Sequence, residues 1–123
     1  MKKLRILVAD AHTYVRHALQ VALPQMNGVA VEVVNEVLVI DELPARVDRL
    51  QPDLLLLDWQ FPQLAQTHLI DVQHRCPHIR IIALSIHAEE RDAALSAGVD
   101  AFVNKGDGAE HLIEAIRKLI EGR

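Results

Sequence analysis

Short apolar runs alternate with amphipathic stretches along the whole chain, and only a few folds accommodate this alternation. Five runs are rich in leucine and β-branched residues: Leu4–Ala9, Val29–Val34, Leu54–Leu57, Ile79–Leu84 and Ala101–Val103. Near-continuous apolar runs of this length are typical of strands that are buried on both faces of a parallel sheet. The runs therefore predict five parallel strands.

The stretches between and after these runs have the periodicity of helices. They include a stripe from Val15 to Ala22, a segment beginning near Asp41, Ala65–His74, Ala88–Ala97 and a last segment with Leu112, Ile116 and Leu119 on one face. Asp41 is predicted to be an N-cap, with Pro44 in the first turn that follows, and Gly98 is predicted to end the fourth helix. Alternating strands and helices favour a single three-layer α/β domain with right-handed crossovers.

The composition excludes several classes of protein. A chain of 123 residues with 50% hydrophobic residues is long enough to bury one core. A net charge of -4 argues against direct contact between this domain and nucleic acid. The single cysteine, Cys76, excludes an intrachain disulfide, and no apolar run approaches the roughly 20 residues that span a bilayer. We therefore expect a cytoplasmic protein without a membrane contact.

Polar residues follow four of the predicted strands. Asp10 follows the first strand, Asp58 the third, Ser85 the fourth and Lys105 the fifth. A single aspartate after a strand is most often a turn or cap residue. However, the carboxyl ends of parallel strands meet at one edge of the sheet, where ligands bind in open α/β folds. The sequence therefore predicts a site in which two carboxylates, a hydroxyl and an ammonium group lie together.

Four ordered motifs resemble the CheY-like receiver domain of bacterial response regulators over essentially the whole chain, residues 1–123. They are Arg5–Asp10, Pro52–Asp58, Ile81–Ser85 and Ala97–Lys105. Two further stretches, Ser85–Glu90 and Glu110–Ile116, most resemble receivers that precede a LuxR-type helix-turn-helix. The resemblance implies a flavodoxin-like fold with strand order 2-1-3-4-5, in which the first and third strands are neighbours.

The resemblance also implies a function in two-component signal transduction. Such a domain is a signalling module rather than an enzyme, and it accepts a phosphoryl group from a sensor histidine kinase, here on Asp58. In the family a Mg²⁺ ion neutralises charge at the site, and its ligands here would be Asp10, Asp58 and the backbone carbonyl of Gln60. Lys105 would place a fixed positive charge next to a phosphoryl oxygen.

A conformational switch is implied as well. In the family, a hydroxyl like that of Ser85 bonds to the phosphoryl group, and an aromatic residue like Phe102 swings inward as the loop moves. The change is then read on the surface of the fourth helix, the fifth strand and the fifth helix. Receivers of this kind control transcription through a DNA-binding output domain, which would lie beyond Arg123, and a homodimer is compatible with this interpretation.

One departure from the family pattern supports an alternative. The family usually has two adjacent acids after the first strand, and here the second position is Ala11. Without the second acid, the site lacks a carboxylate that usually ligates the metal. A second departure is Gln63, which stands where a glycine often follows the proline. The alternative is a pseudo-receiver that binds a partner protein without phosphorylation.

Two other kinds of site are disfavoured by the sequence. A flavin or nucleotide module would need phosphate-binding glycines after the first strand, and Asp10–Thr13 contains none. His74, Cys76 and His78 are potential metal ligands, but their spacing across a predicted helix end does not fit zinc. Solvated loop residues are the simpler interpretation of these three.

Overall fold

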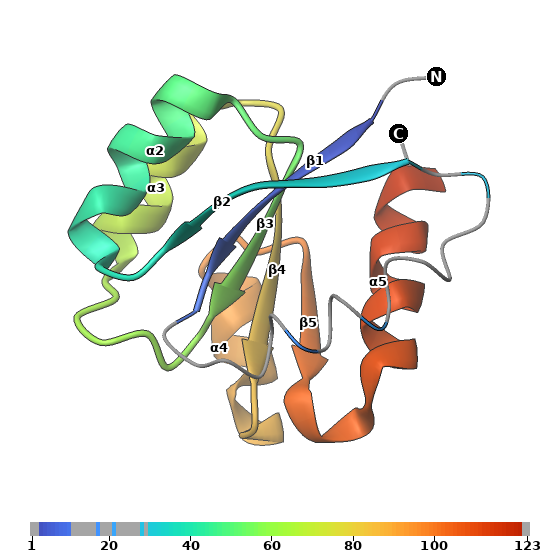
Figure 1. Cartoon of the computed structure of the whole chain (residues 1–123). Helices are drawn as coiled ribbons and strands as arrows, with labels where there is room; N and C mark the ends of the chain where they lie inside the picture. Colours follow the sequence, from blue (N-terminus) through green and yellow to red (C-terminus); the bar gives the residue numbers. More distant parts are fainter. Residues whose placement is uncertain (1–2, 11–16, 18–20, 22–27, 29, 122–123) are drawn as a thin grey trace.

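A five-stranded parallel sheet forms the centre of the molecule, as the computed structural model of residues 3–10, 17, 21, 28 and 30–121 shows (Figure 1). The strands are β1 (Leu4–Ala9), β2 (Val31–Val37), β3 (Leu54–Asp58), β4 (Arg80–Ser85) and β5 (Ala101–Asn104). Their order is β2-β1-β3-β4-β5, and all neighbouring pairs are parallel. This confirms the predicted α/β fold and its strand order.

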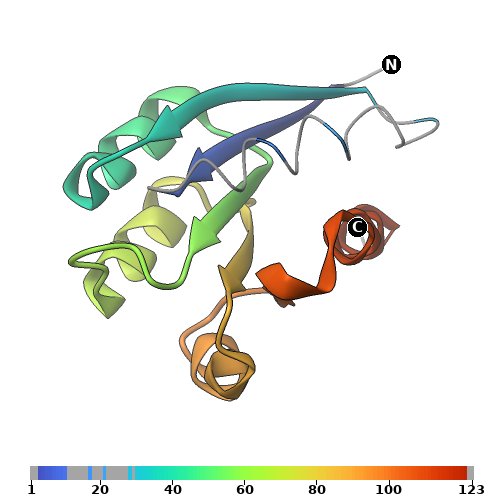
Figure 2. The same cartoon turned by 60° about the horizontal axis from the view of Figure 1, so that its bottom comes forward.

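The two faces of the sheet bury alternate residues of the same strands. Leu55 and Leu57 of β3 belong to a core cluster with residues of α2 (Leu43–Leu50), α3 (Gln66–Arg75) and α4 (Arg91–Ser96). Leu54 and Leu56 belong to a second cluster with residues of α5 (Ala109–Glu121). Figures 1 and 2 show α2 and α3 on one side of the sheet and α5 on the other. Burial on both faces explains why the strand runs are continuously apolar.

Short 3₁₀ segments precede three of the helices: η2 (Ile40–Glu42), η3 (Ala88–Glu90) and η4 (Lys105–Asp107). The predicted N-cap role of Asp41 is wrong, because this residue lies inside η2 and no side chain caps η2 or α2. Its carboxylate instead lies 2.9 Å from Nε2 of His68 on α3. Pro44 lies in the first turn of α2 as predicted, and Gly98 has a φ of +109° after α4.

The strand boundaries agree with the predictions to within one residue except at β2. That strand was expected at 29–34 but covers Val31–Val37, which includes three polar residues, Glu32, Asn35 and Glu36. It is an edge strand and most of its residues are only partly buried, so polar side chains are tolerated there. The helix predicted at Val15–Ala22 lies largely outside the described residues, as does Ala11.

Candidate functional site

The carboxyl ends of β1 and β3 bring two aspartates together. Ala9 of β1 pairs with Leu57 of β3, so the residues that follow them, Asp10 and Asp58, lie at the same level of the sheet edge. Asp10 is only 4% exposed and Asp58 only 1% exposed. Two carboxylates so far from water need compensating charge or hydrogen bonds.

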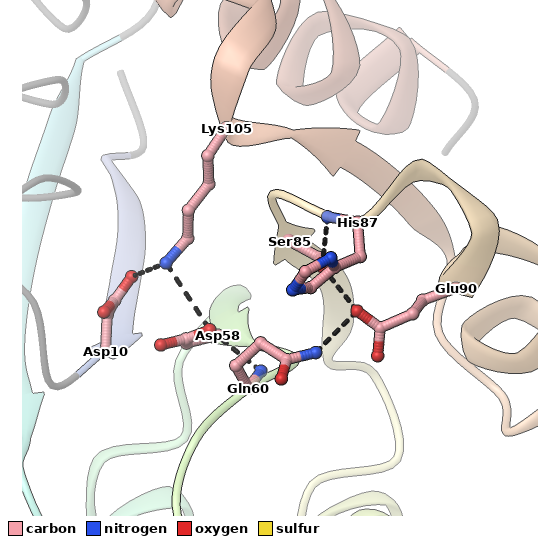
Figure 3. Close-up of polar contacts among 7 residues, drawn as sticks. All are labelled: Asp10, Asp58, Gln60, Ser85, His87, Glu90 and Lys105. Atoms are coloured by element: carbon pink, nitrogen blue, oxygen red, sulfur yellow. Dashed lines mark hydrogen bonds and ion pairs between the residues drawn. The ribbon is translucent and has the colours of Figure 1, made fainter.

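Lys105 supplies a positive charge between these carboxylates. Its Nζ lies 2.9 Å from Oδ2 of Asp10 and 3.4 Å from Oδ1 of Asp58, and its side chain is only 9% exposed (Figure 3). The local backbone helps to place it, because the Asn104 side chain accepts a hydrogen bond from the Gly106 amide and closes a tight turn around Lys105. The structure thus brings Asp10, Asp58 and Lys105 together at one edge of the sheet.

Backbone hydrogen bonds fix the conformation around Asp58. The amide of Trp59 donates to the carbonyl of Leu84 on β4 at 2.8 Å. The amide of Gln60 donates to Oδ1 of Asp58 at 2.9 Å, which orients the carboxylate. Further along the same loop, Gln63 has a φ of +69°, a left-handed conformation that is unfavourable for a residue with a Cβ atom. The position where the family often has glycine therefore adopts a backbone conformation that suits glycine.

Ser85 lies at the end of β4 and is fully buried. Its hydroxyl donates to Oε1 of Glu90 at 2.8 Å, and its oxygen accepts a hydrogen bond from the His87 amide at 2.9 Å. The same Oε1 of Glu90 accepts a hydrogen bond from the side-chain amide of Gln60 at 2.5 Å (Figure 3). Glu90 therefore connects the loop after β3 to the loop after β4.

Glu90 and the side chain of Gln60 were not predicted as site residues. The sequence places Glu90 at the start of an amphipathic stretch, where acidic residues are common because they favour the helix dipole. That signal does not distinguish Glu90 from its neighbour Glu89, which lies 3.7 Å from His87 and has a side chain that is 79% exposed. Only the fold shows that Glu90 faces Ser85.

Phe102 on β5 is 8% exposed and belongs to the core cluster beneath α2, α3 and α4. Together with Ala88, Arg91, Leu95 and residues of α5, it lines a depression over α4, β5 and α5.

The donor set at the aspartate pair suits a hard divalent cation. Both side chains that converge on the Lys105 ammonium offer only carboxylate oxygens, and Mg²⁺ prefers one or two carboxylates together with water. Within the described part of the chain, no group of three or more His, Cys, Asp or Glu side chains could hold a metal ion. A magnesium ion would therefore depend on Asp10, Asp58 and non-acidic oxygens.

Cys76 differs from the prediction for the histidine-rich segment. It is completely buried rather than solvated, and its thiol contacts the Pro52 carbonyl at 3.6 Å and the His78 ring at 3.5 Å. Burial raises the pKa of the Cys76 thiol above its usual value. Cys76 is therefore a core residue that carries a neutral thiol.

No helix within the described residues is long and apolar enough to cross a membrane.

The response regulator protein VraR of Staphylococcus aureus is 28% identical over 122 residues, which cover 97% of this chain and 57% of VraR. The chain thus spans little more than half the length of the curated relatives that it matches.

Solved structures show the same fold. The signal receiver domain of NarL from Mycobacterium tuberculosis is 21% identical, covers 100% of both chains and has a TM-score of 0.80. RcsB from Salmonella enterica serovar Typhimurium, bound to promoter rprA in the presence of the phosphomimetic BeF3-, is 22% identical with a TM-score of 0.80. That match covers 98% of this chain and 63% of the RcsB chain. The profile of the response regulator receiver domain matches residues 6–117, so the protein belongs to this family of signalling domains.

Proposed function

We propose that this receiver domain accepts a phosphoryl group on Asp58 from a sensor histidine kinase. The observation that carries the proposal is the position of Asp58, a buried carboxylate 3.4 Å from the Lys105 ammonium at the carboxyl edge of the sheet. The ammonium compensates negative charge at the place where a phosphoryl group would add more.

The reaction needs one nucleophile and one leaving group. A carboxylate oxygen of Asp58 forms a new O–P bond, and the P–N bond to the kinase imidazole breaks. The electron pair of that bond stays on the imidazole nitrogen, and the product is an acyl phosphate on Asp58. The hydrogen bond from the Gln60 amide to Oδ1 limits rotation of the carboxylate and so favours attack by Oδ2.

A magnesium ion would be held by Asp10, Asp58 and the backbone carbonyl of Gln60. When bound, Mg²⁺ neutralises the charge of the phosphoryl oxygens. Lys105, which lies 2.9 Å from Asp10 without the metal, would then turn toward the phosphoryl group. The alternative, a pseudo-receiver, rests on Ala11, which leaves the site one carboxylate short of the usual family set.

The output would be read on the surface formed by α4, β5 and α5. Ser85 and Phe102 would change together on phosphorylation, since Ser85 ends β4 and Phe102 lies on the neighbouring strand β5, which belongs to this surface. The likeness to VraR and to promoter-bound RcsB supports a longer protein with a DNA-binding output domain that regulates transcription. We propose a homodimer and a cytoplasmic location as well, as expected from the sequence.

Incubation with acetyl phosphate and Mg²⁺ tests this proposal. The wild-type protein should gain one phosphoryl group in its intact mass, and Asp58→Asn should gain none. Asp53→Asn is a matched control because Asp53 is also a buried carboxylate, 6% exposed, but lies at the opposite end of β3. Absence of labelling in the wild-type protein would favour the pseudo-receiver instead.

A further inference from the structure

Glu90 joins the two loops that flank the acceptor aspartate. One oxygen of its carboxylate, Oε1, accepts a hydrogen bond from the Ser85 hydroxyl at 2.8 Å and another from the Gln60 side chain at 2.5 Å. We infer that Glu90 competes with the phosphoryl group for Ser85 and so holds the domain in its unphosphorylated conformation. This inference rests on the proposed phosphorylation of Asp58.

The competition follows from the single proton of the Ser85 hydroxyl. A serine hydroxyl can donate only one hydrogen bond, and here Glu90 receives it. The oxygen of Ser85 already accepts a hydrogen bond from the His87 amide. Ser85 can therefore donate to a phosphoryl oxygen only after the bond to Glu90 has broken. That bond has an ionised acceptor, which makes it stronger than one between neutral groups.

The negative charge of Glu90 adds to this effect. Gln60 contacts Asp58 through its backbone amide and Glu90 through its side chain, so the Glu90 carboxylate is linked to the acceptor through one residue (Figure 3). A phosphoryl group carries about two negative charges at neutral pH and is repelled by a nearby carboxylate. Phosphorylation therefore favours a conformation in which Glu90 has moved away.

The position of Glu90 in the chain connects this movement to the output surface. Glu90 is the last residue of η3 and the N-cap position of α4. Its amide donates to the His87 carbonyl at 3.0 Å, within the same turn. Release of Glu90 from Ser85 would therefore shift the first turn of α4. The bridge formed by Glu90 thus opposes both the Ser85 contact with phosphate and the rearrangement of α4.

Substitutions at Glu90 test the inference through the affinity for beryllofluoride, measured with Mg²⁺ present. Glu90→Ala should raise the apparent affinity about tenfold or more, because one hydrogen bond to a charged group no longer has to be broken. Glu90→Gln keeps an acceptor but loses the charge, so its gain should be smaller. Glu89→Gln is the matched control, since this exposed neighbour does not contact Ser85, and it should behave like the wild type.

A second background shows whether the effect passes through Ser85. In Ser85→Ala the gain from Glu90→Ala should shrink markedly, because the hydroxyl for which the two groups compete is gone. A gain that is equally large in both backgrounds would overturn the role of Ser85 in the inference. Unchanged affinity in Glu90→Ala, with wild-type protein that binds beryllofluoride, would overturn the inference itself.

Measurements on metal-free protein show whether the Glu90 bridge exists, independently of whether Asp58 is phosphorylated. In metal-free protein, Glu90→Ala should speed hydrogen exchange at the His87 amide roughly 2- to 10-fold, since its acceptor Ser85 is less firmly held. The NMR signals of the Gln60 side-chain amide should shift as well. If these changes occur but neither variant nor wild type binds beryllofluoride, the proposed function is wrong and the competitor role fails with it. If exchange and shifts match the wild type, the Glu90 bridge is absent and the inference is wrong on its own.

Discussion

The ammonium group of Lys105 lies 2.9 Å from the carboxylate of Asp10, although 95 residues separate them in the chain. The contact joins the carboxyl ends of β1 and β5, which are not neighbours in the sheet. It places a buried cation where the third residue of the site, Asp58, also approaches within 3.4 Å. In the described structure, the positive charge that compensates the two carboxylates comes from the Lys105 side chain.

Removal of this charge should destabilise the metal-free protein. In Lys105→Met two buried carboxylates lose the ammonium that lies between them, which should cost about 3 kcal/mol of unfolding free energy. Urea unfolding measures the loss, and Mg²⁺ should restore part of it. Lys118→Met is the control, because Lys118 is exposed on α5 and its loss should change little. Equal stability of both variants would mean that Lys105 does not compensate the carboxylates.

A carboxylate at position 11 should strengthen metal binding. Position 11 lies outside the described residues, so this prediction rests on the sequence pattern. Loss of an outer contact to a metal ligand costs roughly 10- to 100-fold in affinity, so the gain from a directly ligating carboxylate in Ala11→Asp should be at least tenfold. Fluorescence of the single tryptophan, Trp59, which follows Asp58 directly, can report the Mg²⁺ titration. Unchanged affinity would show that another group already fills this position.

Gln63 should be a site of backbone strain. Its φ of +69° is costly for a residue with a Cβ atom and free for glycine, so Gln63→Gly should stabilise the protein by about 0.5 to 1 kcal/mol. Gln51 has a φ of +45° as well, but its side chain donates to the carbonyls of Asp48 and Arg75. Gln51→Gly should therefore destabilise the protein. Thermal unfolding of the two variants should give shifts of opposite sign, and shifts of the same sign would show that backbone strain at Gln63 does not decide the effect.

Cys76 should make stability depend on pH in the alkaline range. Burial raises the pKa of its thiol in the folded state, so the folded protein retains a proton that the unfolded chain loses above about pH 8.5. Ionisation then stabilises the unfolded state, so the free energy of unfolding should fall as the pH rises through this range. Cys76→Ala should be less stable at neutral pH but show a smaller decrease. A decrease of equal size in both proteins would assign it to other groups.

The convergence of Asp10, Asp58, Ser85 and Lys105 on one edge could be predicted, because it follows from strand direction and from the resemblance that gave the strand order. The Glu90 bridge could not, since it depends on how the loops after β3 and β4 turn and on side-chain conformations. The shift of β2 and the position of Asp41 could not be predicted either. An edge strand tolerates polar residues that obscure its limits, and a 3₁₀ turn before α2 displaced the helix start.

Chemical identification of the phosphorylated residue shows whether Asp58 is the phosphoryl acceptor. After incubation with acetyl phosphate and Mg²⁺, borohydride reduces an acyl phosphate of aspartate to homoserine, which peptide mass analysis can locate. We expect homoserine at position 58 and at no other aspartate, with Asp10 and Asp53 unchanged. Homoserine at another position, or none in protein that carries a phosphoryl group, would contradict the assignment of Asp58 as the acceptor.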